Sequence, residues 1–250
     1  MRVAVLSDIH ANLPALEAVL ADTEDAGIEE RWCLGDVVGY GADPNECAEL
    51  TAARCEVCLV GNHDLAVLGK LDASTFSSAA AAAVEWTIAR SSVATLAYLR
   101  NLEPADATRA AALYHASPRD PVWEYVLWPD QAAECLAAQE RRVSLIGHSH
   151  VALFFSAPDP GVGVRAAPEA RGWQAGAGTR LEIGEGRWLI NPGSVGQPRD
   201  GDPRAAWLEL DTESWEATYH RVPYDVERAA GAIERAGLPE HLARRLAVGR

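Results

Sequence analysis

Short motifs of histidine, aspartate and asparagine recur along this chain of 250 residues, each directly after an apolar run. The motifs are Asp8-Ile9-His10, Gly35-Asp36, Gly61-Asn62-His63-Asp64, His115 and Gly147-His148-Ser149-His150. Imidazole, carboxylate and amide groups without a thiolate suit divalent manganese, iron, zinc, cobalt or nickel, and the residue types do not choose among these metals. The motifs therefore predict a metal centre if the fold brings them together.

Asp36 is the residue around which we expect this centre to form. It closes an apolar run and opens the glycine-rich stretch 37–41, so its side chain can project beyond the end of a buried strand. A carboxylate has two oxygens and can place one on each of two cations. A Gly-Asp pair is also an ordinary turn, but four other motifs point to the same kind of site. We therefore expect Asp36 to bridge two metal ions.

Two of the motifs place metal-binding side chains two residues apart. In an extended chain, side chains at positions i and i+2 point to the same side. Asp8 and His10 are therefore expected to face one cation while Ile9 turns toward the core. His148 and His150 repeat this spacing, so their imidazoles are expected to point to one side of the chain.

The Gly61-Asn62-His63-Asp64 motif combines a ligand with a proton donor. The amide oxygen of Asn62 can bind a cation without adding negative charge, which leaves the adjacent His63 free to donate a proton to a substrate oxygen. Asp64 is expected to orient that imidazole. An Asn/Asp turn is the structural alternative for this motif, and a structural role is the alternative for His115.

The elements that must position these residues read as alternating strands and helices. Strands are expected at 2–6, 32–34, 57–60, 110–114 and 143–146, each ending at a motif, and helices are expected after Asn12-Pro14, at 46–53 and at 131–139. Strand, helix and strand form a βαβ unit at the start of the chain. Such units carry their sites at the carboxyl ends of the strands, where Asp8, His10 and Asp36 fall.

The remaining sequence predicts a β-rich second half with two special segments. The stretch 66–102 is expected to be a helical insertion, and the region 157–178, rich in Pro, Gly and Ala, a long flexible loop or a ragged hairpin. Strands are expected at 181–183, 188–190, 205–210 and 217–222, and a polar helix at 225–236. The arginine-rich terminal segment reads as a solvated face.

Composition restricts the class of protein. With 48% hydrophobic residues the chain can bury one sizeable core, so we expect a single α/β domain over 1–250. No run of 18 or more apolar residues is present, and the N-terminus reads as a strand rather than a signal peptide. The five scattered cysteines indicate free thiols in a reducing cytoplasm. The net charge of −14, with Lys70 the only lysine, disfavours long nucleic acid or an anionic membrane as a partner.

Taken together, the motifs resemble those of the calcineurin-like metallophosphoesterases. They occur in that family's order from Val3 to about Arg199, and the cluster 191–198 resembles the closing loop of its small bacterial phosphodiesterase branch. Five of the seven histidines lie in the motifs. The resemblance implies an α/β fold with four layers, α/β/β/α, in which two mixed β-sheets are flanked by helices.

The resemblance also implies a role for each motif residue. It assigns Asp8, His10 and His150 to one metal, Asn62, His115 and His148 to a second, and Asp36 to both. It assigns His63 to the leaving group or the phosphoryl oxygens. Two divalent ions would lower the pKa of a shared water and clamp the phosphoryl oxygens during in-line attack.

The expected function is therefore dinuclear-metal-dependent hydrolysis of a small phosphodiester or phosphomonoester by metal-bound hydroxide. The alternatives are a phosphoprotein phosphatase and a non-catalytic phosphate-binding regulatory module, of which the second would need a centre that lacks ligands or His63. None of these residues is missing. The expected partner is a small phosphoester, and the sequence leaves the oligomeric state and the identity of the metals open.

Overall fold

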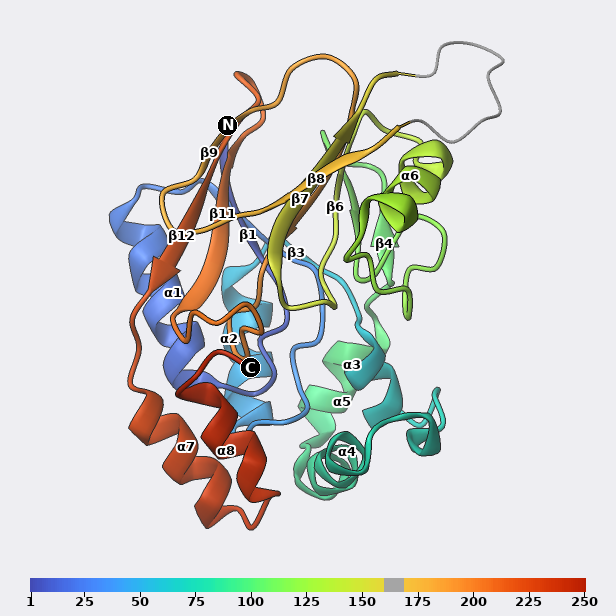
Figure 1. The fold of residues 1–250 in the computed structure, drawn as a ribbon. Helices are drawn as coiled ribbons and strands as arrows, with labels where there is room; N and C mark the ends of the chain where they lie inside the picture. Colours follow the sequence, from blue (N-terminus) through green and yellow to red (C-terminus); the bar gives the residue numbers. More distant parts are fainter. Residues whose placement is uncertain (160–168) are drawn as a thin grey trace.

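Two six-stranded β-sheets pack face to face between helices in the computed structural model, which describes residues 1–159 and 169–250 (Figure 1). The strand order is β3-β2-β1-β11-β12-β9 in the first sheet and β4-β5-β6-β10-β7-β8 in the second. The first sheet contains β1 Arg2–Leu6, β2 Glu30–Cys33, β3 Val57–Cys58, β9 Arg180–Glu182, β11 Ala205–Asp211 and β12 Glu216–Val222. The second contains β4 Ala105–Asp106, β5 Ala112–Tyr114, β6 Val143–Leu145, β7 Ala152–Ala157, β8 Arg171–Gln174 and β10 Arg187–Pro192.

Helices cover the outer faces of both sheets, which confirms the predicted four-layer arrangement (Figure 1). The helices are α1 Leu13–Asp25, α2 Pro44–Arg54, α3 Asn62–Val67, the 3-10 turn η1 Ala73–Thr75, α4 Ser78–Arg90, α5 Val93–Arg100, α6 Pro129–Ala138, α7 Val226–Arg235 and α8 Glu240–Leu246. Most of the expected helical insertion at 66–102 is occupied by η1, α4 and α5.

The central strand β1 shows how the sequence pattern builds these layers. Side chains alternate across a strand, and β1 is buried on both sides. Val3 and Val5 face the other sheet in the inter-sheet core, whereas Ala4 and Leu6 pack in the core beneath α1. An almost continuous apolar run is therefore what this position requires.

Both sheets are mixed, and their parallel strands carry the motifs. Strand β1 pairs in parallel with β2, and β2 with β3, while α1 makes the crossover that the sequence predicts. In the second sheet β6 pairs in parallel with β5 and with β10. Parallel strands end at a common edge, so the loops after β1, β2, β3, β5 and β6 gather there.

Part of the predicted flexible loop at 157–178 is a strand. Residues 160–168 of that loop lie outside the described residues. Beyond them, β8 pairs antiparallel with β7, and Trp173 stacks on Phe154 with ring centroids 5.2 Å apart. Glycine is unusual in a strand, so the composition of this region does not predict one. Gly172 is needed here because a Cβ would clash with the ring of Phe155.

The arginine-rich C-terminal segment differs from expectation as well. It forms α8, whose Leu242, Ala243 and Leu246 are buried against α7 and Ala83 of α4. Only one face of the segment is therefore solvated, because apolar residues at helical spacing lie among its arginines.

The described residues contain no helix with the length and apolar character needed to cross a membrane. All five cysteines are free thiols, as expected.

Candidate metal centre

The fold brings all seven predicted ligands to the edge where the parallel strands end. Asp8 and His10 follow β1, Asp36 follows β2, Asn62 follows β3, His115 follows β5, and the last two histidines follow β6. Every one of these side chains is buried. Six of them form two groups whose potential ligand atoms lie within 4.8 Å of one another, namely Asp8, His10, Asp36 and His150 in one and Asp36, His115 and His148 in the other.

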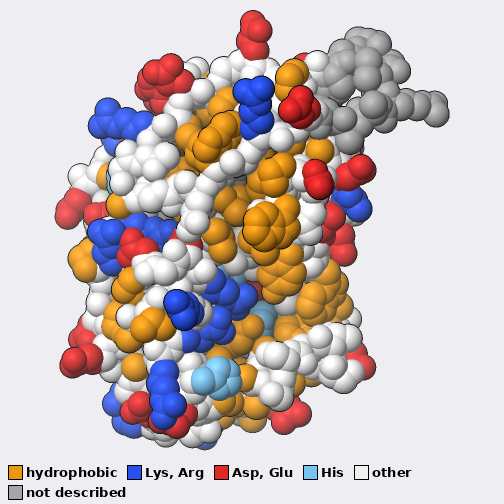
Figure 2. Space-filling view, in the orientation of Figure 1, with side chains coloured by type: hydrophobic (Ala, Val, Ile, Leu, Met, Phe, Trp, Pro, Cys, Tyr) orange, Lys and Arg blue, Asp and Glu red, His pale blue; other side chains and the backbone are white. Residues whose placement is uncertain are grey.

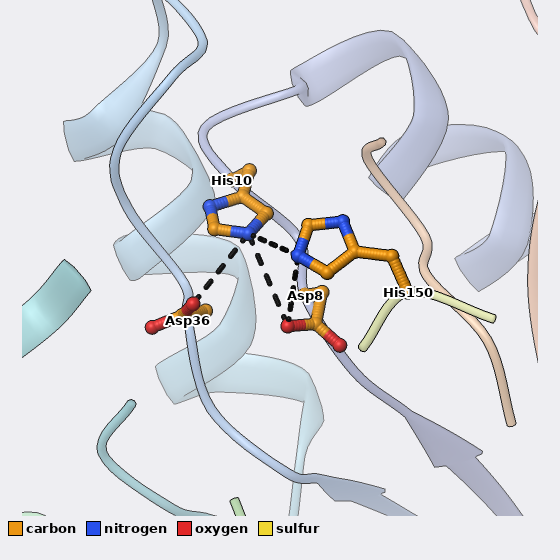
Figure 3. A group of neighbouring side chains, drawn as sticks. All are labelled: Asp8, His10, Asp36 and His150. Carbon is orange, nitrogen blue, oxygen red and sulfur yellow. Dashed lines mark hydrogen bonds and ion pairs between the residues drawn. The ribbon is translucent and has the colours of Figure 1, made fainter. Parts of the chain in front are cut away.

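Asp36 is the member that both groups share. In the first group, its Oδ2 lies 3.5 Å from His10 Nε2, and His150 Nε2 lies 3.4 Å from Asp8 Oδ1 (Figure 3). In the second, Asp36 Oδ2 lies 3.6 Å from His115 Nε2, which is 3.1 Å from Asn62 Oδ1. Asp36 Oδ1 accepts from the backbone amide of His63 at 2.9 Å, so the single oxygen Oδ2 faces both groups, instead of one oxygen facing each as the sequence predicted.

Hydrogen bonds from the outer ring nitrogens fix the orientation and the tautomer of three histidines. Nδ1 of His10, His115 and His150 donates to the carbonyl oxygens of Val38, Leu34 and Gln197 at 3.2, 2.9 and 2.7 Å. Because a carbonyl can only accept, the proton must be on Nδ1, which leaves Nε2 with a lone pair directed into the cluster. Histidines that bind a metal usually donate their other ring N–H to a carbonyl in this way.

Several inward-facing atoms have no partner within the described part of the chain. Asp8 Oδ1, Asp36 Oδ2 and His148 Nε2 are buried and accept or donate no hydrogen bond. In addition, His10 Nε2 and His150 Nε2 lie only 3.1 Å apart. Buried polar atoms are normally paired, and converging lone pairs repel unless a cation lies between them. The donor set therefore fits a divalent metal.

The backbone at the ligands is left-handed rather than extended. The φ angles are 54° at Asp8, 50° at His10, 53° at Asp36, 63° at His148 and 59° at His150. We expected extended backbone to point the side chains of each Asp-x-His or His-x-His pair to one side. This expectation is therefore wrong. A left-handed non-glycine residue costs about 1 to 3 kcal/mol, and such residues are concentrated at functional sites.

Hydrogen bonds between neighbouring loops hold this backbone in place. The amides of Asp8 and His10 donate to the carbonyls of Gly35 and Asp36 at 3.0 and 2.9 Å. On the other side, the loop after β10 reaches back, and Gly196 donates to the carbonyl of Asp8 at 3.0 Å. The strain at each ligand is thus offset by partners far away in the sequence.

Burial sets the protonation preferences of the cluster. Burial raises the pKa of Asp8 to about 7, and burial followed by the nearby Asp64 carboxylate raises the pKa of Asp36 well above its usual value. Burial also lowers the pKa values of His10, His148 and His150 well below that of an exposed histidine. These three imidazoles therefore favour the neutral form, which metal ligands require.

His63 and Asp64 have different surroundings. The ring of His63 lies between Tyr40 and Phe76, with centroids 4.3 and 4.9 Å away, and its centroid is 4.9 Å from that of His10. Asp64 was expected to orient this ring, but no hydrogen bond joins the two side chains among the described residues. Its carboxylate instead accepts from the backbone amides of Val37, Val38 and Gly61 at 3.2, 3.0 and 2.9 Å. Asp64 thus joins the loops after β2 and β3.

Arg199 brings positive charge to the same edge. It donates to Gln197 Oε1 at 2.9 Å and to the Tyr40 hydroxyl at 3.4 Å, and its Nε is buried without a partner in the described part of the chain. No described carboxylate forms an ion pair with it. Its guanidinium lies 5.7 Å from the centroid of the Tyr40 ring. On the face drawn in Figure 2, histidines at the centre lie between a group of Lys or Arg side chains and a band of hydrophobic ones.

Four aromatic residues near the centre were not predicted from the sequence. Besides Tyr40 and Phe76, Trp123 and Tyr125 lie with their ring centroids 6.3 and 4.0 Å from that of His148. Tyr40 could have been suspected because it lies in the glycine-rich stretch after Asp36. Nothing in the sequence around the other three indicates proximity to the motifs.

Comparisons with known proteins agree with this geometry. A family model described as the calcineurin-like phosphoesterase superfamily domain matches residues 1–213. An uncharacterized protein of Methanocaldococcus jannaschii is 38% identical, covering 99% of this chain and 98% of its own length. The structure of a metallophosphoesterase from Sphaerobacter thermophilus is 39% identical with a TM-score of 0.86, covering 100% and 99% of the two chains. A hypothetical protein from Pyrococcus horikoshii, 22% identical, shares the fold with a TM-score of 0.75 over 100% and 98% of the chains.

Proposed function

Because this chain belongs to the calcineurin-like phosphoesterase superfamily, we propose that it hydrolyses a small phosphodiester or phosphomonoester at the buried Asp/His cluster. The observation that carries the proposal is the pair of donor groups that share Asp36, with buried carboxylate and imidazole atoms that have no hydrogen-bond partner among the described residues. A non-catalytic module would not need this complete donor set together with His63.

Asp8, His10 and His150 would hold one divalent ion, and Asn62, His115 and His148 would hold the other, with Asp36 shared between them. When bound, the ions supply Lewis-acid stabilisation of the phosphoryl oxygens and a water of lowered pKa. The chain contributes the rigid placement of the ligands, since each ligand loop is joined by backbone hydrogen bonds to its neighbour.

His63 is proposed to donate a hydrogen bond to a phosphoryl or leaving-group oxygen. Burial lowers the pKa of His63 well below the usual histidine value, so its neutral ring has one N–H to donate. The rings of Tyr40 and Phe76 fix its orientation. Hydrogen-bond donors that are fixed in advance stabilise a transition state because they need no reorganisation during the reaction.

Arg199 is proposed to bind a phosphoryl oxygen of the substrate. Its guanidinium has an unused donor and no carboxylate partner among the described residues. A planar guanidinium with free N–H groups suits a phosphate. Local attraction of this kind is what an anionic substrate needs in a protein of net charge −14.

The test combines metal analysis of the purified protein with hydrolysis of bis(p-nitrophenyl) phosphate, p-nitrophenyl phosphate and a phosphoserine peptide in added Mn²⁺. We expect bound metal and hydrolysis of at least one small ester at a higher rate than the peptide. Asp36→Asn should lower metal content and nearly abolish turnover because both groups lose their shared anionic oxygen. Asp25→Asn, at an exposed position on α1, is the matched control. A metal-loaded protein that hydrolyses none of the esters, or an active Asp36→Asn variant with full metal content, would contradict the proposal.

A further inference from the structure

Three aromatic side chains, Phe76, Trp123 and Tyr125, line one side of the metal centre and are here called the aromatic rim. The ring centroids of Phe76 and Trp123 are 5.0 Å apart, and the two ring planes are inclined at 62° to each other. Phe76 contacts His63, while Trp123 and Tyr125 contact His148. The rim therefore borders both the residue proposed to contact the phosphoryl group and a ligand of the second donor group.

The rim remains accessible in the folded chain. Tyr125 is 43% exposed, although its ring lies at 31° to that of His148 with centroids 4.0 Å apart. Phe76 and Trp123 are partly exposed. Aromatic rings that are exposed side by side around a polar centre are typical of a ligand-binding site.

The loop that carries Trp123 is held in place before any ligand arrives. The carboxylate of Asp120 accepts from the amides of Val122 and Trp123 at 3.0 and 3.1 Å. Further back, Ala116 donates to the carbonyl of Pro121 at 2.9 Å. A surface that is ordered in advance loses little entropy when it binds a flat ligand.

The polar ends of the rim have no partners of their own. Within the described residues, neither the indole N–H of Trp123 nor the hydroxyl of Tyr125 forms a hydrogen bond, although four other tryptophans of the chain use theirs. A purely hydrocarbon ligand would leave both groups unused. A flat heterocycle that carries acceptor atoms could stack on the rings and also accept from these donors.

Resting on the proposed function, we infer that the aromatic rim binds the nucleobase of a nucleoside phosphoester, whose phosphate lies between His63 and Arg199. The cationic side of the centre, with Arg199, faces the phosphate, and the aromatic side faces the base. Stacking of a base on an aromatic ring is favourable and does not depend strongly on which base is present.

The inference is tested by calorimetric binding of adenosine 5′-monophosphate, ribose 5-phosphate and hexyl phosphate to the Mn²⁺-loaded protein, with each ligand checked for hydrolysis afterwards. The first two probes share the sugar phosphate and differ in the base, and the third replaces the nucleoside by an alkyl chain. We expect the nucleotide to bind about tenfold or more tightly than ribose 5-phosphate, which is the range for one stacked base.

Variants then connect this preference to the rim. Trp123→Leu and Tyr125→Leu should each reduce the ratio of nucleotide to ribose 5-phosphate affinity severalfold, and Trp123→Phe should retain most of it. Trp128→Leu is the matched control, because Trp128 is 68% exposed and makes no ring contact with a histidine among the described residues. Metal content is measured in every variant, so a substitution that disturbs the metal site is recognised by its loss of metal.

Three outcomes would overturn the inference. These are equal affinity for the nucleotide and ribose 5-phosphate, equal affinity for the nucleotide and hexyl phosphate, and an affinity ratio that Trp123→Leu and Tyr125→Leu leave unchanged. The first would restrict the rim to shielding the histidines, and the second would make it a general apolar surface. Hydrolysis of bis(p-nitrophenyl) phosphate is measured in parallel, so failure of the proposed function is seen independently of base binding.

Discussion

Each histidine of the first donor group has two nitrogens with different partners. Nδ1 of His10 and of His150 donates to a backbone carbonyl, and Nε2 points into the cluster (Figure 3). The carbonyl keeps the proton on Nδ1, and because burial keeps the ring neutral, the lone pair of Nε2 is directed inward before a metal arrives. Burial lowers the pKa of both rings well below that of an exposed histidine. Ligand basicity and orientation are therefore built into the folded chain.

At the residue scale, His63 should be separable from the ligands. His63→Ala should retain the metal content and fold of the parent, because the ring belongs to neither donor group. The rate should fall by about 10² to 10³, the usual effect of removing one fixed hydrogen-bond donor. Metal analysis, circular dichroism and kcat on a small ester make the comparison.

His241→Ala is a control for that experiment, because His241 is an exposed residue on α8. Loss of metal from His63→Ala would make His63 a ligand instead of a hydrogen-bond donor. An unchanged rate with full metal content would remove it from the reaction.

At the scale of elements, the loops after parallel strands pack so closely that two of their positions have no room for a Cβ atom. Gly61, the residue immediately before α3, lies so close to the Asp36 carboxylate that a Cβ there would clash with it. In the second sheet, a Cβ at Gly147 would clash with the Ser7 hydroxyl and crowd the Asp8 carboxylate. These glycines allow the loop after one strand to pack directly on the metal-binding residue of another.

Gly61→Ala is therefore expected to lower metal content and activity more than it lowers overall stability. The backbone at Gly61 has φ −100° and ψ 179°, which alanine adopts easily, so the effect comes from displacement of Asp36. Metal content, activity and the melting temperature of the metal-free protein are measured together.

Gly176→Ala is the matched control, because a Cβ there meets nothing within 4 Å. If Gly61→Ala binds metal and hydrolyses esters as the parent does, the close packing of these loops is not required for the centre.

At the scale of the whole molecule, the centre depends on both sheets. Asp8 and Asp36 follow strands of the first sheet, whereas His115, His148 and His150 follow strands of the second. The sheets meet through the inter-sheet core, and His148 donates its backbone amide to the Asp8 carboxylate at 3.1 Å. The candidate centre therefore forms only when the two sheets pack together.

Removal of metal should therefore destabilise the whole domain. The site exists only in the folded chain, so a hundredfold excess of metal over its dissociation constant should raise the melting temperature by about 5 to 10 °C. Chelation should reverse this, and readdition of metal should restore it. An unchanged melting curve after demonstrated metal removal would argue against a buried centre that links the sheets.

Net charge leads to a prediction about substrate size. Long duplex DNA requires a track of cationic groups, and a chain of net charge −14 with one lysine is not expected to offer one. We expect hydrolysis of small diesters or nucleotides with little action on duplex DNA, compared at low salt and with the same metal. Low salt favours weak electrostatic binding, so processive degradation of duplex there would overturn the small-substrate prediction and leave the metal centre unaffected.

The sequence by itself determined the types of ligand, their order and their places after apolar strands. Alternation and apolar runs predict strands such as β1 and β2, and residues at a strand end must emerge at the edge of a sheet. The motif residues Asp8, Asp36 and His115 could therefore be proposed as one site without coordinates. These are local properties, because each depends only on neighbours along the chain.

Only the tertiary structure decided how those residues converge. The left-handed backbone at Asp8, His10 and His148 is held by hydrogen bonds to distant loops, so these residues approach one another for a reason other than the extended spacing. The same holds for Asp64, which joins two loops instead of orienting His63, and for the aromatic rim, whose rings come from segments far apart in sequence. Contacts of this kind are set by the packing of whole strands and loops, which no short stretch of sequence encodes.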